Sequence, residues 1–253
     1  MEANAASQLR RGRRNGYAGD PMHLRAVAFD IDGTLYPNRI MLRRSVGFGI
    51  RHARLLFHFA KVRKTIRATR PIEDFYRLQA RLMADALGCP EDVVRAKIQR
   101  EIYDRWELVL RRVPLYDQVS ELIDDLEHSG LRLAVMSDFP VARKLELLGL
   151  DGRWDCAIST EQVGYLKPNP EPFETLVACL EVSASEILYV GNSYEYDVVG
   201  ASRAGLRTAW LNDRDGTDNR ARSGIQPDFT FSHYRELRTW LAPHLTSEGR
   251  SIK

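Results

Sequence analysis

Short apolar runs that alternate with helical patterns constrain the fold of this chain more than any other feature. The apolar runs lie at 24–29, 131–136, 156–159, 187–190, 208–211 and 229–231. Helical patterns lie among them at 117–129, 141–148, 171–180, 196–204 and 234–241. Continuous apolar runs of this length are typical of parallel strands that are buried on both faces. The alternation therefore predicts an α/β fold, with a doubly wound parallel sheet and a ligand site beyond the carboxyl ends of its strands.

The alternation is interrupted between Pro37 and Pro114. This stretch contains no convincing strand and predicts helices near 39–68, 72–87 and 91–111. With 253 residues the chain is long enough for one domain that carries an insertion. We therefore expect a core formed by 23–37 and 114–245, and an inserted helical cap domain at 38–113.

The ends, the cysteines and the charge set limits on the class of protein. Residues 1–22 are rich in Ala, Gly, Asn and Arg and lack the apolar centre of a signal peptide, which predicts a disordered basic arm. Cys89, Cys156 and Cys179 form no CxxC pair, so we expect small buried residues in a reducing compartment and a cytoplasmic protein. The net charge is only +3, so no specific nucleic-acid partner is expected. The polar segment 212–226 predicts an exposed loop.

Two carboxylates leave the first apolar run together. Asp30 and Asp32 are separated by one residue and are followed by Gly33 and Thr34. Carboxylates this close repel each other unless a cation neutralises them, and an oxygen-rich site favours Mg²⁺. A lone Asp-Gly pair is commonly only a loop cap, but the full pattern after a buried strand is much rarer by chance. We therefore predict a Mg²⁺ site here.

Three further polar groups follow later elements of the predicted sheet, namely Ser137-Asp138, Lys167 and the segment 191–197. Alone, the first is no more than a helix N-cap and the second a surface lysine. Their order along the chain indicates a shared ligand site, because ligands of a parallel sheet bind where the strands end.

The four groups resemble the motifs of the haloacid dehalogenase superfamily. The match runs from about Leu24 to Leu241 and includes the stretch Leu-Lys-Pro-Asn-Pro-Glu-Pro-Phe at 166–173. The resemblance implies a phosphatase-type hydrolase with a helical cap between the first and second motifs. It also implies Mg²⁺ as cofactor and a small phosphorylated metabolite as substrate.

The resemblance further implies a role for each motif residue. Asp30 would attack phosphorus and form an aspartyl-phosphate, and Asp32 would serve as general acid and then as general base. Asp197 would orient Lys167 or a metal-bound water. The phosphate would be held by the group Thr34, Ser137, Asp138 and Lys167. The metal would be held by Asp30, Asp32 and Asn192.

Asn192 departs from the pattern of the superfamily, whose phosphatases usually have Asp at this position. An amide oxygen can still bind Mg²⁺, but the site loses one negative charge and should bind the ion more weakly. Dehalogenases of the superfamily carry an aromatic residue in place of the second motif Asp, so Asp32 argues against dehalogenation. A phosphomutase, or a catalytically weak relative that binds a phosphorylated ligand or a partner, remains an alternative.

The start of the insertion is strongly basic. No acidic residue lies from Tyr36 to Ile72, although the stretch has ten Lys or Arg. A helical projection gives two apolar stripes, one of Leu42, Val46, Ile50, Ala53, Phe57 and Ala60, and one of Phe48, Leu55, Phe59, Val62 and Ile66. The first stripe is expected to dock the cap helix, and the second to need a further partner. Gly47 and Gly49 weaken the helix and are expected to mark a break within it.

The basic residues leave three interpretations open. They can be solvated outside a packed helix, attract a phosphorylated substrate, or form a surface for anionic membrane, nucleic acid or another subunit. The chain is accordingly expected to be a monomer or a homodimer.

Overall fold

Six parallel strands form one sheet in the computed structural model, which describes residues 23–212 and 224–245. The strands are β1 (Ala26–Asp30), β2 (Arg132–Ser137), β3 (Cys156–Ser159), β4 (Ile187–Gly191), β5 (Arg207–Leu211) and β6 (Phe229–Phe231). Their order across the sheet is β3-β2-β1-β4-β5-β6, as expected for a doubly wound sheet. The predicted fold class is confirmed. The predicted basic arm at 1–22 and most of the predicted loop at 212–226 lie outside the described residues.

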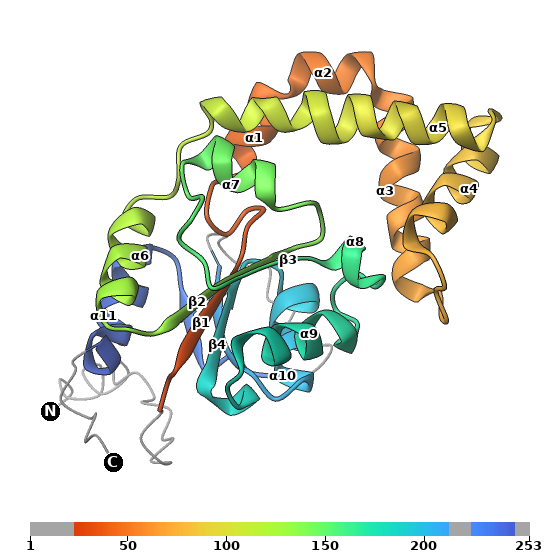
Figure 1. Ribbon diagram of the computed structural model, residues 1–253. Helices are drawn as coiled ribbons and strands as arrows, with labels where there is room; N and C mark the ends of the chain where they lie inside the picture. The colour runs from red at the N-terminus through yellow and green to blue at the C-terminus, as the bar shows by residue number, and fades with distance from the viewer. Residues whose placement is uncertain (1–22, 213–223, 246–253) are drawn as a thin grey trace, which may run out of the picture.

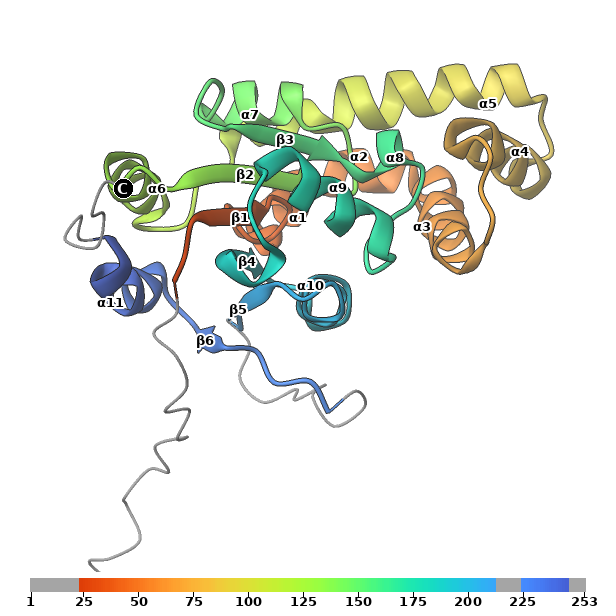
Figure 2. The ribbon, with the colours of Figure 1, turned by 60° about the horizontal axis from the view of Figure 1, so that its bottom comes forward.

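Helices cover both faces of the sheet (Figures 1 and 2). The core helices and helical turns are α6 (Val119–His128), α7 (Ala142–Leu148), α8 (Thr160–Val163), α9 (Pro170–Leu180), η3 (Ala184–Glu186), η4 (Tyr194–Val198), α10 (Val199–Arg203) and α11 (Tyr234–Leu245). Alternate residues of β1 point to opposite faces, so Val27 and Phe29 pack with α6 and α11, whereas Ala26 and Ala28 pack under α9. Both sides of the strand are thus fully buried, which explains its continuous apolar sequence.

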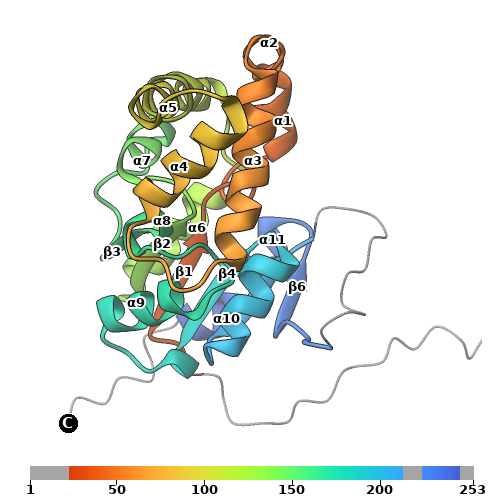
Figure 3. The ribbon, with the colours of Figure 1, turned by 90° about the vertical axis from the view of Figure 1, so that its right-hand side faces the viewer.

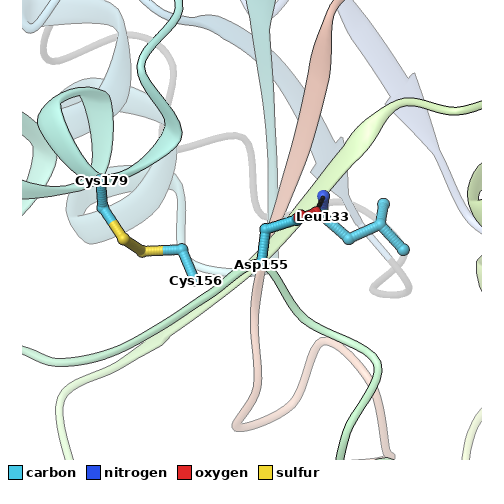
Figure 4. Close-up of a disulfide and its surroundings, with 4 residues drawn as sticks. All are labelled: Leu133, Asp155, Cys156 and Cys179. Carbon is cyan, nitrogen blue, oxygen red and sulfur yellow. Dashed lines mark hydrogen bonds between the residues drawn. A yellow bond between two sulfur atoms is a disulfide. The ribbon is translucent and has the colours of Figure 1, made fainter.

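A disulfide joins the sheet edge to a helix. Cys156 of β3 and Cys179 of α9 are bonded, with 1.97 Å between their sulfur atoms (Figure 4). Just before β3, the Asp155 carboxylate accepts a hydrogen bond from the Leu133 N–H at 2.8 Å and aligns the edge strand with β2. The expectation of three free cysteines was therefore wrong, and among the described residues only Cys89 remains a thiol. Sequence spacing could not reveal the pair, because 23 residues separate the two cysteines.

The insertion between β1 and β2 is helical, as predicted, and lies beyond the carboxyl ends of the strands (Figure 1). Its elements are α1 (Asn38–Arg44), α2 (Val46–Arg51), α3 (Ala53–Ala68), α4 (Phe75–Leu87), α5 (Glu91–Ile98), a π-helical segment η1 (Gln99–Trp106) and a 3₁₀ segment η2 (Glu107–Arg112). The division into separately folding core and cap domains stays a prediction. Across the described ranges, no helix has the length and apolar character required to cross a membrane.

The first predicted helix of the insertion is broken into three. Ser45 and His52 separate α1, α2 and α3, and the break falls on either side of Gly47 and Gly49, the two glycines that weaken the helix. The two apolar stripes also exchange the roles expected of them. The second stripe supplies Leu55, Phe59, Val62 and Ile66 to the core of the insertion. Every residue of the first stripe is exposed instead.

Three arginines, two on the last turns of α3 and one just beyond its end, attach the insertion to the core. Arg63 pairs with Glu161, Arg67 with Asp138 and Arg70 with Glu171. The spacing of four residues places Arg63 and Arg67 on one face of α3, because 3.6 residues make a turn, and Arg70 lies two residues beyond the end of the helix. Part of the basic sequence thus serves to hold α3 against α8, α9 and the loop after β2.

Candidate active site

The register of the central strands brings the sequence motifs together. Asp30 at the end of β1 lies opposite Met136 of β2, so that Ser137 follows at the same edge. On the other side, Phe29 pairs with Val190, and Gly191 comes next on β4. The carboxyl ends of β1, β2 and β4 therefore meet, as parallel strands require.

Asp30 lies at the centre of a buried network. One carboxylate oxygen accepts a hydrogen bond from Thr34 Oγ1 at 2.7 Å, and the other contacts Lys167 Nζ at 2.7 Å. Lys167 Nζ also contacts Asp197 Oδ1 at 2.6 Å and Tyr189 Oη at 3.1 Å. Burial raises the pKa of Asp30 to about 7, and the Asp197 and Asp32 carboxylates add to the increase while Lys167 opposes it. Desolvation alone would lower the pKa of Lys167, but Asp197 and Asp30 hold it well above its usual value.

A close approach of the backbone at Gly191 keeps Asp197 in position. A Cβ at Gly191 would collide with the Asp197 side chain. The second oxygen of that carboxylate accepts a hydrogen bond from the Ser193 N–H at 2.9 Å, at the start of η4. Asp197 is thus fixed from both sides and directed at Lys167.

Asp32 points into a second polar network. Its carboxylate accepts hydrogen bonds from Tyr36 Oη and Ser137 Oγ, both at 2.6 Å. Lys144 Nζ lies 2.6 Å from each of the two oxygens. Burial would raise the pKa of Asp32, but Lys144 and the hydrogen bonds outweigh burial and leave the pKa below its usual value.

Asp138 is placed differently from the other motif residues. Its carboxylate accepts hydrogen bonds from Thr160 Oγ1 at 2.8 Å and from the Lys167 N–H at 3.1 Å, and it pairs with Arg67 of α3. Burial raises its pKa, but Lys167 and Arg67 more than offset this and lower it. The side chain therefore connects the end of β2 and the loop that carries Lys167 to the insertion.

The oxygen atoms near Asp30 suit a hard cation. Gly33, with φ +91°, turns the chain so tightly that an added Cβ would collide with the amides of Asn38 and Asn192. The Asn192 side chain therefore lies beside the Asp30–Gly33 turn, where its amide oxygen, the Asp30 carboxylate and the Asp32 carbonyl could serve as ligands. Mg²⁺ commonly binds proteins through one or two carboxylates and keeps several waters, so this donor set fits the ion. Among the described residues no group of three or more acidic, His or Cys side chains could hold a metal.

A pocket of about 280 Å³ opens beside Asp32, between the core and the insertion. Most of its lining is apolar or aromatic, including Met41, Leu42, Ile102, Trp106, Leu110 and Phe139. Its polar lining includes Asp32, Lys144 and Glu107. A largely apolar pocket with a few polar groups is typical of a small-molecule site.

Glu107 carries an uncommitted carboxyl group at this pocket. The residue is 8% exposed, and within the part of the chain that the structure describes no side-chain hydrogen bond to it is formed. Burial raises its pKa to about 7, against the opposing effect of Lys144. Because this carboxyl group borders the pocket, it is available to a ligand there.

Several residues of the site were not identified in the sequence. Lys144, Tyr36 and Glu107 lie outside the four motifs. Lys144 follows Ser137 by seven residues, and its 4% exposure in a short core helix is unusual for a lysine. The contact of Lys144 with Asp32, 112 residues away in sequence, becomes apparent only when the strands are assembled.

Comparisons with known proteins agree with this architecture. A family model described as haloacid dehalogenase-like hydrolase matches residues 24–205. Ribulose-1,5-bisphosphate 5-phosphatase of Halopiger xanaduensis is 26% identical over 234 residues, 84% of this chain and 97% of the relative. Glyceraldehyde 3-phosphate phosphatase of Methanopyrus kandleri is 29% identical over 230 residues, 85% of this chain and 95% of the relative.

A solved structure shares the fold. The putative HAD-hydrolase YfnB of Bacillus subtilis, a structure bound to magnesium, superposes with a TM-score of 0.61 at 18% identity, covering 87% of this chain and 99% of the other. This likeness concerns the fold alone. Because the family model spans well over half of the sequence, the chain belongs to the haloacid dehalogenase-like hydrolases.

Proposed function

We propose that this protein is a Mg²⁺-dependent phosphatase that hydrolyses a small phosphorylated metabolite through a covalent phosphate on Asp30. The observation that carries the proposal is the pairing of two carboxylates in different environments at the end of β1. Asp30 is buried and contacts Lys167, whereas Asp32 faces the pocket and contacts Lys144. Burial raises the pKa of Asp30, and a cation bound beside it would lower that pKa and favour the ionised nucleophile. Asp32 instead contacts Lys144, which places a proton donor next to the pocket.

In the first step, an Asp30 oxygen attacks phosphorus and the bond from phosphorus to the substrate oxygen breaks. The departing alcohol needs a proton, and the Asp32–Lys144 pair supplies it, since Lys144 Nζ lies 2.6 Å from both Asp32 oxygens and Asp32 faces the pocket. Lys167 offsets the charge of the phosphoryl oxygens, and the Ser137 and Thr34 hydroxyls would donate hydrogen bonds to those oxygens after turning away from Asp32 and Asp30. In the second step water attacks phosphorus, gives its proton back to the pair, and restores Asp30 as phosphate leaves.

Mg²⁺, bound by Asp30, the Asp32 carbonyl and Asn192, would supply electrostatic stabilisation of the phosphoryl group. Among the described residues, three carboxylates, those of Asp30, Asp32 and Asp197, form ion pairs with only two ammonium groups, those of Lys144 and Lys167. The chain's own charges therefore leave room for a cation. Asp197 keeps Lys167 directed at Asp30 whether or not the cation is bound.

The substrate is a phosphate monoester of a small alcohol. The two relatives are named for ribulose-1,5-bisphosphate and glyceraldehyde 3-phosphate, both phosphorylated metabolites. In this chain the pocket beside Asp32 would receive the alcohol. Its apolar lining and the free Glu107 carboxyl favour an alcohol with an apolar portion and a hydrogen-bond donor. A phosphomutase would use the same first step and would pass the phosphate to a sugar hydroxyl.

The test is hydrolysis of an aryl phosphate with and without Mg²⁺, by wild type, Asp30→Asn and the control Asp151→Asn, whose carboxylate is exposed. We expect Mg²⁺-dependent release of phosphate, lost by at least about a thousandfold in Asp30→Asn and retained in the control. Equal rates in Asp30→Asn and wild type would exclude Asp30 as nucleophile. Absence of hydrolysis in the wild type across a panel of phosphorylated metabolites would favour the weak relative that only binds.

A further inference from the structure

The outer face of α1, α2 and the start of α3 is apolar and lacks a partner in the described structure. Leu42 is 62% exposed, Val46 56%, Ile50 77% and Phe57 66%. Neither α1 nor α2 contains a buried residue. Large apolar side chains that are exposed together along one short stretch of chain, 42–57, rather than scattered singly, indicate an interaction surface.

A hydrogen bond and ring stacking hold these helices in place. Trp106 Nε1 donates a hydrogen bond to Ser45 Oγ at 2.9 Å, and Phe48 stacks on His52 at 4.3 Å between ring centres. Figures 1 and 3 show α2 at the outermost edge of the insertion, away from the sheet. The exposed stripe is therefore a projecting and accessible edge of the molecule.

Positive charge surrounds the stripe. The exposed basic residues beside it are Arg39, Arg43, Arg44, Arg51, Arg54, Lys61 and Lys64. Glu101 lies 3.6 Å from His52 on the neighbouring helix, but it is 3% exposed and paired with Arg100 and Arg105. The face therefore presents cations that no acidic residue within 36–72 can neutralise.

A hollow next to Arg44 extends this charge. It has a volume of about 550 Å³ and is lined by Arg105, Arg111 and Arg112 as well as Arg44. Leu108, which is 36% exposed, also borders it. Four guanidinium groups around one hollow suit a phosphate group, since guanidinium donors match phosphate oxygens.

We propose that this face docks on an anionic lipid bilayer, with the apolar stripe inserted at the headgroup boundary and the arginines on lipid phosphates. An apolar stripe flanked by basic residues is the pattern of helices that lie in the plane of a membrane surface. Nucleic acid would match the arginines but would leave the aliphatic side chains exposed to water. A second copy would place arginines against the same arginines across a two-fold axis.

Docking would also bring the active-site pocket near the lipid surface, because Leu42 belongs both to the stripe and to the pocket lining. The inference does not depend on the proposed phosphatase activity, since it concerns binding alone. Of the interpretations open for the basic residues of the insertion, the proposal selects binding to an anionic membrane.

The experiment is flotation of the full chain with vesicles of phosphatidylcholine alone or mixed with phosphatidylserine, at low and high salt. The apolar variant is Ile50→Ser/Phe57→Ser, with Val93→Ser on α5 as control, since Val93 is 51% exposed outside the stripe. The charge variant is Arg43→Glu/Arg51→Glu, with Arg235→Glu on α11 as control. Unfolding midpoints establish that each variant folds.

We expect binding to the mixed vesicles only, weakened by salt. The apolar variant and the charge variant should each lower the partition coefficient at least about tenfold, and both controls should leave it unchanged. No binding to the mixed vesicles, or equal losses in variants and controls, would overturn the proposal. Formation of a dimer that Ile50→Ser/Phe57→Ser abolishes, or binding of an oligonucleotide in place of vesicles, would assign the face to another partner and equally overturn it.

Discussion

Arg63 offers the most quantitative test of how the insertion is attached to the core. Its guanidinium is 5% exposed and pairs with the fully buried Glu161 carboxylate. It also donates to the Asp138 carbonyl at 2.6 Å and lies 4.2 Å from the centre of the Phe139 ring. Substitution Arg63→Met keeps much of the side-chain volume but leaves Glu161 with Tyr103 as its remaining hydrogen-bond donor.

Removing one partner of a buried ion pair costs about 3–5 kcal/mol, because the other charge stays buried without compensation. At about 2–4 °C per kcal/mol for a protein of this size, the melting temperature should fall by ~6–20 °C. The double variant Arg63→Met/Glu161→Gln should recover much of the loss, since it buries no lone charge. Urea and thermal unfolding of both variants measure these effects.

The matched control is Arg153→Met. Arg153 pairs with Asp124 and Glu127, whose side chains are 52% and 37% exposed, and an exposed pair contributes about 0–1 kcal/mol. If Arg63→Met proved no more destabilising than Arg153→Met, or if Glu161→Gln failed to rescue it, the buried pair would not be what anchors α3.

Two further substitutions test the site. Asn192→Asp adds a carboxylate beside Asp30 and should lower the Mg²⁺ concentration for half-maximal rate several-fold, whereas an unchanged Mg²⁺ dependence would show that Asn192 is not a ligand. Glu107→Gln tests the raised pKa of Glu107, which is about 7 in the folded chain against 4.5 without burial. Because the folded state binds this proton more tightly than the unfolded state, the free energy of unfolding of wild type falls as pH rises from about 4.5 to 7. Glu107→Gln should therefore be more stable than wild type by about 3 kcal/mol at pH 8, and equally stable near pH 4. Urea unfolding at the two pH values checks this, and the same gain at both would contradict the assignment.

The sheet could be predicted because its strands are buried on both faces and therefore carry an unambiguous apolar signal. All six predicted strands exist, and Asp30, Ser137 and Gly191 meet because parallel strands end at one edge. The motifs could be placed at one edge of the sheet for the same reason.

The insertion was less predictable, because two apolar stripes on one basic segment give no information on which of them is covered. Burial of Phe59 and Ile66 depends on elements from later in the chain, on α4, which packs against α3, and on α5, which packs against α4. Lys144 and Arg67 could not be assigned for a similar reason. Their partners, Asp32 and Asp138, lie 112 and 71 residues away in sequence.

The central claim is that phosphate passes through Asp30, and trapping the covalent enzyme tests it most directly. Wild type would be mixed with Mg²⁺ and a phosphate monoester labelled at phosphorus, quenched in acid within one turnover, digested and mapped by mass spectrometry. The account predicts a base-labile phosphate on the peptide that contains Asp30, and none in Asp30→Asn. Label on a different residue, or steady turnover by wild type with no protein-bound phosphate at any time, would contradict it.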